Sequence, residues 1–147
     1  SETVECLRGD ASRLPIPDGH FDSVVAMRFF RLMDDPLAFM RELRRVSADQ
    51  VFFDTFNRRS LRVVYTWLLP MGSRLYSEQR VAELLGAADM ILASETHDFV
   101  LPYGFYRGLP GPIAKPFRVL DELIGATIPG DYVASVSYWD ARIDDEK

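Results

Sequence analysis

The 147-residue sequence has very few of the residues that build metal sites and covalent cross-links: one cysteine, Cys6, and two histidines, His20 and His97. A single cysteine forms no internal disulfide, which is consistent with a reducing, cytoplasmic setting. One cysteine and two distant histidines do not supply the ligands of a structural zinc ion, so we expect no metal. No apolar run approaches the ~20 residues that span a bilayer, and no signal-peptide pattern occurs, so we expect no membrane span.

Lysine is also scarce, and the 22 acidic residues outnumber the 17 lysines and arginines, for a net charge of −5. Binding to phosphates requires clustered positive charge, so nucleic acid is not expected as a partner. Arg41, Arg44 and Arg45 do cluster, but with Glu42 among them they are typical of a solvated helix face. The 48% hydrophobic content is sufficient for one domain with its own core. We expect that domain over residues 1–143 and a frayed tail over 144–147.

The order of predicted elements alternates strands and helices, which indicates an α/β fold. Residues 22–27 form an almost continuous apolar run, typical of a strand that is covered on both faces. Asp35 followed by Pro36 predicts the start of a helix. The other predicted elements are strands over 50–56, 91–101 and 132–142, helices that begin at Ser60 and Ser77, a short helix over 116–124, and an extended piece over 4–7 before Gly9-Asp10.

Residues 9–22 read Gly-Asp-Ala-Ser-Arg-Leu-Pro-Ile-Pro-Asp-Gly-His-Phe-Asp. After the predicted strand come Arg-Leu-Met-Asp-Asp-Pro at 31–36, Phe-Met-Arg-Glu-Leu-Arg-Arg-Val at 39–46 and the helix over 77–88. This ordered set resembles class I S-adenosylmethionine-dependent methyltransferases, similar to the ubiquinone and menaquinone biosynthesis type, over roughly residues 5–100. The resemblance implies a partial Rossmann-like sheet, mostly parallel with an antiparallel C-terminal strand, with helices against it. It also implies S-adenosylmethionine as the cofactor.

In the family that this sequence resembles, a carboxylate at the position of Asp10 accepts a hydrogen bond from the adenine amino group. The resemblance also places the backbone of Ala11 against the adenine ring and Met27 beside the methionine part of the cofactor. Two simpler interpretations stand beside these roles. Asp10 after Gly9 is also a common turn residue, and Met27 is also a common core residue.

Candidate contacts to a small methyl acceptor come from arginine and from two aromatic segments. Arg31 stands where related enzymes have an arginine on the active-site floor, although it could equally pair with Asp34 or Asp35. The segments 65–76 and 99–107 fall where family members cover their substrate, which suits an apolar or aromatic acceptor. They also suit the core between helices and sheet. The acceptor contacts that we expect are Tyr76, Tyr103, Tyr106 and Arg107.

The sequence departs from the family pattern before residue 9. No glycine-rich turn, and no acidic residue to hold the ribose, precedes Asp10. We therefore expect this chain to be the C-terminal part of a catalytic domain, a truncated domain that by itself binds S-adenosylmethionine weakly or not at all. The strand over 22–27 would then have a free edge, which is a template for a homo-oligomer or for a separately supplied segment.

Two smaller departures concern the ends of helices. Residues 47–50 replace the glycine-rich turn that usually ends the mid-domain helix. Asp89 stands where the family has glycine, and aspartate tolerates the left-handed conformation better than most residues do.

No catalytic residue is assigned from the sequence. Methyl transfer to an activated methyl group needs positioning, and it needs a base only when the acceptor must lose a proton. His97 next to Asp98 suggests a base, but neighbours on a strand point to opposite faces, so we expect His97 to be a structural or surface residue. The expected function is methyl transfer to a small acceptor. The alternative is a non-catalytic binding or regulatory protein that keeps a methyltransferase-like remnant and pairs with a partner chain.

Overall fold

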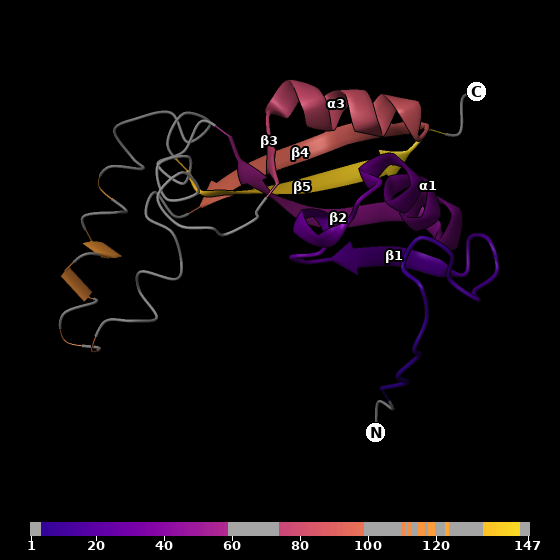
Figure 1. Cartoon of the computed structure of the whole chain (residues 1–147). Helices are drawn as coiled ribbons and strands as arrows, with labels where there is room; N and C mark the ends of the chain where they lie inside the picture. Colours follow the sequence, from indigo (N-terminus) through magenta and orange to yellow (C-terminus); the bar gives the residue numbers. More distant parts are fainter. Residues whose placement is uncertain are drawn as a thin grey trace.

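The computed structural model describes residues 4–58, 74–98, 110, 112, 115–116, 118–119, 123 and 134–144 (Figure 1). The strands are β1 (Phe21–Ala26), β2 (Ser47–Asn57), β3 (Leu75–Tyr76), β4 (Met90–Asp98) and β5 (Val136–Ile143). The helices are the 3-10 turn η1 (Phe30–Leu32), α1 (Pro36–Val46) and α3 (Glu78–Ala87). The helix expected to begin at Ser60 lies outside the described residues. Of the helix expected over 116–124, the described residues 116, 118, 119 and 123 are helical.

The sheet has the order β1-β2-β5-β4, with the short β3 beside β2. β1 and β3 run parallel to β2, whereas β5 is antiparallel to both of its neighbours, β2 and β4. Four of the described strands therefore share one direction, and β5 runs against them. This arrangement confirms the predicted α/β fold with a mostly parallel sheet and an antiparallel C-terminal strand.

The helix α1 begins as the sequence predicts and ends differently. The Asp35 carboxylate accepts hydrogen bonds from the amides of Leu37 and Ala38, and Pro36 occupies the first turn, where no amide partner is needed. At the other end Ser47 is already extended, and its amide donates to the Leu43 carbonyl. The helix thus passes directly into β2. Residues 47–50 belong to the strand, so no glycine-rich turn is required there.

The helix α3 also follows the sequence signals. Its N-cap is Ser77, whose hydroxyl accepts a hydrogen bond from the Arg80 amide at 3.2 Å. The chain leaves the helix through Asp89, which has a φ of 54°. The prediction that Asp89 substitutes for glycine in a left-handed position is confirmed.

Both helices pack on the same face of the sheet (Figure 1), and the core lies between them and the strands. Phe30 of η1 is at its centre, almost completely buried. Its ring lies 5.2 Å from Phe39 of α1, 4.8 Å from Phe53 of β2 and 6.0 Å from Tyr76 of β3, measured between ring centroids. Aromatic contacts therefore join η1 to α1, β2 and β3.

The N-terminal segment reaches the sheet along α1. Residues 4–9 are exposed and outside any strand, so the extended piece expected over 4–7 takes no place in the sheet. From residue 14 the chain follows the last turns of α1. The amide of Leu14 donates to Glu42, and the amide of Gly19 donates to the Arg45 carbonyl at 2.7 Å. The segment enters β1 from the end of the sheet where α1 meets β2.

Candidate functional site

The carboxyl ends of the parallel strands meet at one edge of the sheet. β1, β2, β3 and β4 all end there, and the antiparallel β5 begins there. Ligands of open α/β sheets bind beyond this edge. Two pockets of the described residues lie along it: a β1–β2 pocket and a histidine pocket between β2, β3, β4 and β5.

The β1–β2 pocket is organised by a hydrogen bond between Asp54 and the chain that leaves β1. Asp54 is a buried residue near the end of β2, and its carboxylate accepts a hydrogen bond from the Arg28 amide. Arg28 has a φ of 63°, in the left-handed region that non-glycine residues rarely adopt. The strained turn is held by a buried acceptor, which is the kind of support that functional sites use. The lining residues are Arg28, Arg31, Asp54, Thr55 and Phe56.

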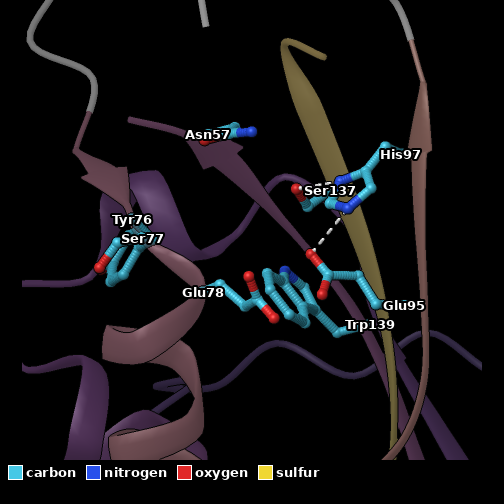
Figure 2. A pocket seen from close by; sticks show the side chains of 8 residues that line it. All are labelled: Asn57, Tyr76, Ser77, Glu78, Glu95, His97, Ser137 and Trp139. Carbon is cyan, nitrogen blue, oxygen red and sulfur yellow. Dashed lines mark hydrogen bonds and ion pairs between the residues drawn. The ribbon is translucent and has the colours of Figure 1, made fainter. Parts of the chain in front are cut away.

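The histidine pocket combines polar side chains from each strand that borders it (Figure 2). His97 of β4 contacts two of the other lining residues. Its Nδ1 atom is 2.9 Å from the Ser137 hydroxyl, and its Nε2 atom is 3.1 Å from the Glu95 carboxylate. The other lining residues are Asn57, Tyr76, Ser77, Glu78 and Trp139.

The sheet register explains why these three side chains meet. Glu95 and His97 are two residues apart on β4, so both point to the same face. His97 lies opposite Ser137 in the antiparallel β4–β5 pair, and Glu95 lies opposite Trp139. Sequence reasoning that pairs His97 with its neighbour Asp98 misses Glu95. The spacing of two residues between Glu95 and His97 was the signal that could have found the pair.

Tyr76 also lines the histidine pocket. The residue is buried, and its hydroxyl lies 3.5 Å from the Phe30 carbonyl. Burial raises the pKa of the phenol. The hydroxyl is thus kept in its neutral form, in which it donates a hydrogen bond. Of the two roles weighed for the aromatic segment 65–76, the packing of Tyr76 on Phe30 matches the core role, and its place at the pocket matches the acceptor role.

Asp10 lies in an exposed turn. Unlike the pocket residues described above, it does not lie at the end of a strand. Its Oδ1 atom accepts hydrogen bonds from the Ser12 amide at 2.9 Å and the Ser12 hydroxyl at 2.6 Å. These bonds, the hydroxyl first and the amide second, lower the pKa of the carboxyl group. Oδ2 has no hydrogen bond to the described residues. Ala11, next in the turn, is partly buried against the core.

The other sequence candidates divide between the pocket edge and the part of the chain that is not described. Met27 directly follows β1 and is 45% exposed. Arg31 is exposed in η1 and lines the β1–β2 pocket. Of the two carboxylates weighed as partners of Arg31, Asp34 pairs with Arg74 at 2.8 Å, and Asp35 caps α1. Tyr103, Tyr106 and Arg107 lie outside the described residues.

Within residues 4–58, 74–98 and 134–144 and the described positions between them, no group of three histidine, cysteine, aspartate or glutamate residues is arranged to hold a metal ion. No helix in the same part of the chain is long and apolar enough to cross a membrane.

Residues 1–53 match a protein-family model described as a methyltransferase domain. No curated protein matches the chain. Among solved structures, the chain is similar to a SAM-dependent methyltransferase of Thermotoga maritima described as a possible histamine N-methyltransferase. The identity is 15% and the TM-score 0.65, over 95% of this chain and 63% of that one.

Two further solved structures extend the comparison. The [4+2]-cyclase SpnF has 19% identity and a TM-score of 0.59, over 95% of this chain and 54% of that one. A Haloferax volcanii methyltransferase solved in complex with the Trm112 activator has 16% identity and a TM-score of 0.61, over 94% of this chain and 60% of that one. The chain thus spans less than two thirds of each of these structures. The family match and the strand order together confirm the resemblance: this chain has the fold of a class I methyltransferase domain.

Proposed function

We propose that this chain is the C-terminal part of the catalytic domain of an S-adenosylmethionine-dependent methyltransferase. Its substrate would be a small, apolar or aromatic acceptor, and residues 1–143 would form one unit in the cytoplasm. The observation that carries the proposal is the edge of the sheet where four strand ends and the start of β5 meet. Two pockets lie there, in a chain whose first third matches a methyltransferase domain.

The described residues fit parts of the cofactor. Asp10 is exposed and its pKa is lowered, so it is an ionised acceptor, and its Oδ2 atom has the chemistry to bind an adenine amino group. The backbone of Ala11, whose residue packs against the core, would meet the adenine ring. Met27, at the end of β1, would border the methionine part. When bound, S-adenosylmethionine supplies a methyl group that its sulfonium has already activated.

The residues of this chain would orient the acceptor and exclude water from it. Arg31 and the β1–β2 pocket would form the floor of the site, and Tyr76 would contact the acceptor from β3. We also assign acceptor contacts to Tyr103, Tyr106 and Arg107. Positioning of this kind lowers the barrier because the reacting atoms no longer need to be brought together from solution.

The free edge of β1 supports the idea that the chain is an incomplete domain. β1 ends the sheet on one side and pairs only with β2 among the described strands. Val25 on β1 is 63% exposed, and Phe21 is 41% exposed. An apolar strand with an unpaired edge is a template for another strand. We propose that this edge takes a strand of a preceding segment, or of a second copy when that segment is absent.

Isothermal titration with S-adenosylmethionine tests the cofactor assignment. The chain of 147 residues is compared with the product of the full native reading frame, whose mass is determined first. We expect micromolar binding by the native product and weak or no binding by the 147-residue chain. Micromolar binding by the 147-residue chain alone would overturn the proposal that it is an incomplete domain. Absence of binding by the native product would overturn the proposal that the protein is a methyltransferase.

The substitution Asp10→Ala tests the adenine contact in the native product. Loss of one hydrogen bond to an ionised acceptor predicts binding weaker by roughly a factor of ten. The control is Asp49→Ala. Asp49 is exposed near the amino end of β2, away from the pockets at the carboxyl end, and it pairs with Arg142. Equal binding by the two variants would remove Asp10 from the cofactor site.

A further inference from the structure

The histidine pocket contains a directional chain of hydrogen bonds. The Ser137 hydroxyl lies 2.9 Å from Nδ1 of His97, and Nε2 of His97 lies 3.1 Å from Glu95 (Figure 2). The tautomer with its hydrogen on Nε2 satisfies both contacts, since Nε2–H donates to the carboxylate and Nδ1 accepts from the hydroxyl. A proton entering at Ser137 can therefore pass to His97, where Glu95 stabilises the positive charge.

The position of these three hydrogen-bonded side chains within the fold favours a role in chemistry over a role in packing alone. His97 is the next-to-last residue of β4, and Asn57 and Tyr76 are the last residues of β2 and β3. All three line the pocket at the edge where this type of sheet binds ligands. The side chains of His97 and Glu95 are 20% and 15% exposed. Partial burial strengthens their interaction and leaves a route for the proton to reach water.

Among the described residues, the groups that line the histidine pocket come from β2, β3, β4, β5 and the start of α3. Glu95 is on its own strand, Tyr76 is on β3 and Glu78 is in the first turn of α3, and these are the titratable groups among the lining residues. Asn57 of β2 and Ser137 and Trp139 of β5 carry no charge. Of these groups, the Glu95 carboxylate contacts the imidazole directly, and a carboxylate in that place stabilises the imidazolium after proton transfer.

We propose that Ser137, His97 and Glu95 form a proton relay for the methyl acceptor, and that the methylated atom is an oxygen or nitrogen that carries a proton. The inference rests on the proposed methyltransferase function and names the acceptor class for it. The acceptor O–H or N–H donates to the Ser137 oxygen. As the new bond from oxygen or nitrogen to the methyl carbon forms, the carbon–sulfur bond breaks and its electron pair stays on sulfur.

The proton balance follows the hydrogen bonds. The acceptor proton goes to Ser137, the Ser137 proton goes to Nδ1 of His97, and the imidazolium later releases one proton to water. The net products are the methylated acceptor, a neutral thioether and a proton. In this scheme Ser137 contacts the substrate, whereas His97 and Glu95 act through it.

Activity of the native product on matched acceptors tests the relay. The probes are 2-naphthol, which must lose a proton, and N,N-dimethylaniline, which is methylated without losing one. For 2-naphthol we expect kcat/KM to fall by roughly 100-fold in His97→Asn and Ser137→Ala. The rise of kcat/KM with pH should also disappear in both variants. Ser137→Thr keeps the hydroxyl and should restore most of the activity.

Several outcomes of the same assay decide against the relay. N,N-dimethylaniline should be methylated equally by the wild type and by His97→Asn, and an equal loss on both probes would assign His97 a structural role only. The control His20→Asn, at an exposed turn, should leave both rates unchanged. Hydrolysis of p-nitrophenyl acetate that depends on Ser137 would identify a nucleophile and overturn the relay.

Nitrogen-15 NMR of the His97 side chain separates this inference from the proposed function, because it needs no methyl transfer. We expect the Nε2–H tautomer in the wild type and a mixture of tautomers in Glu95→Gln. Addition of 2-naphthol should shift the His97 signals, and 2-methoxynaphthalene, which has no proton to donate, should not. If neither ligand shifts them, the relay is wrong even where S-adenosylmethionine binds. If the native product binds no cofactor but the shifts occur, the methyltransferase assignment fails and the proton-accepting pocket remains.

Discussion

The guanidinium of Arg45 holds both oxygens of Glu42, with Nη2 2.7 Å from Oε1 and Nε 3.0 Å from Oε2. The same guanidinium donates to the carbonyl oxygens of Leu14 and Ile16 and pairs with Asp18. One arginine thus ties the segment before β1 to the end of α1. The arginine cluster that is predicted to be a solvated helix face therefore includes, at Arg45, a residue that attaches the N-terminal segment.

Replacement of Arg45 by methionine should destabilise the protein by about 2–3 kcal/mol, because the buried Glu42 loses its charged partner and keeps the hydrogen bond from the Leu14 amide. Urea unfolding followed by circular dichroism measures the change. Arg80→Met is the matched control, since Arg80 and Glu83 form an exposed pair on α3 at 3.0 Å. That pair should contribute about 0.5 kcal/mol or less. Equal effects of the two substitutions would show that the Arg45 contacts contribute no more to the free energy of unfolding than an exposed ion pair does.

The stability of the protein should fall in acid partly through Glu42. Its pKa is lowered in the folded state, chiefly by the hydrogen bonds from Arg45. The stabilisation is therefore complete above the pKa of the unfolded state and is lost as the pH falls through the folded-state value. We expect the difference in free energy of unfolding between wild type and Glu42→Gln to shrink below about pH 4.5. Glu83→Gln is the control, and a difference that stays constant with pH would contradict the assignment.

The free edge of β1 should make this chain associate with itself. Light scattering after size-exclusion chromatography should find dimers of the 147-residue chain at high concentration. Val25→Lys should reduce them, because a lysine protects an edge strand from pairing. The control is Ile91→Lys on β4, the strand at the opposite edge, where Ile91 is 54% exposed. A chain that is monomeric at every concentration would contradict the prediction.

The backbone at Asp89 offers a test of helix termination. Its φ of 54° suits glycine and disfavours β-branched residues. We expect Asp89→Val to be less stable than Asp89→Gly by about 1–2 kcal/mol, as measured by thermal unfolding. If the two variants have the same stability, the left-handed conformation at this position is not retained in solution.

The sequence predicted the fold better than the site because its strongest signals are local. The caps at Asp35 and Ser77, the apolar strand after residue 20 and the left-handed Asp89 each depend on a few neighbouring residues. The structure confirms both caps, the left-handed Asp89 and the presence of the strand. The expectation that this strand is covered on both faces is wrong for the described residues, since Val25 of β1 is 63% exposed while Ala26 is buried. The pocket around His97 depends on Ser137, which is 40 residues away, and on a register that only the folded sheet determines. The hydrogen bond from the Arg28 amide to Asp54 joins two strand ends, so it also depends on the folded sheet.

The position of Asp10 shows the limit of an argument from motif alone. The motif places the carboxylate beside the cofactor, and its ionised state agrees with that role. The chain before it is exposed and forms no strand, so nothing in the sheet fixes the turn from that side. The adenine contact therefore stays a prediction that the Asp10→Ala titration decides.

The last of the described strands, β5, lies between β2 and β4 and pairs with both of them. Removal of β5 would therefore divide the described sheet in two, with β1, β2 and β3 on one side and β4 on the other. Loss of an outer strand such as β1 would leave the remaining strands paired and would only narrow the sheet.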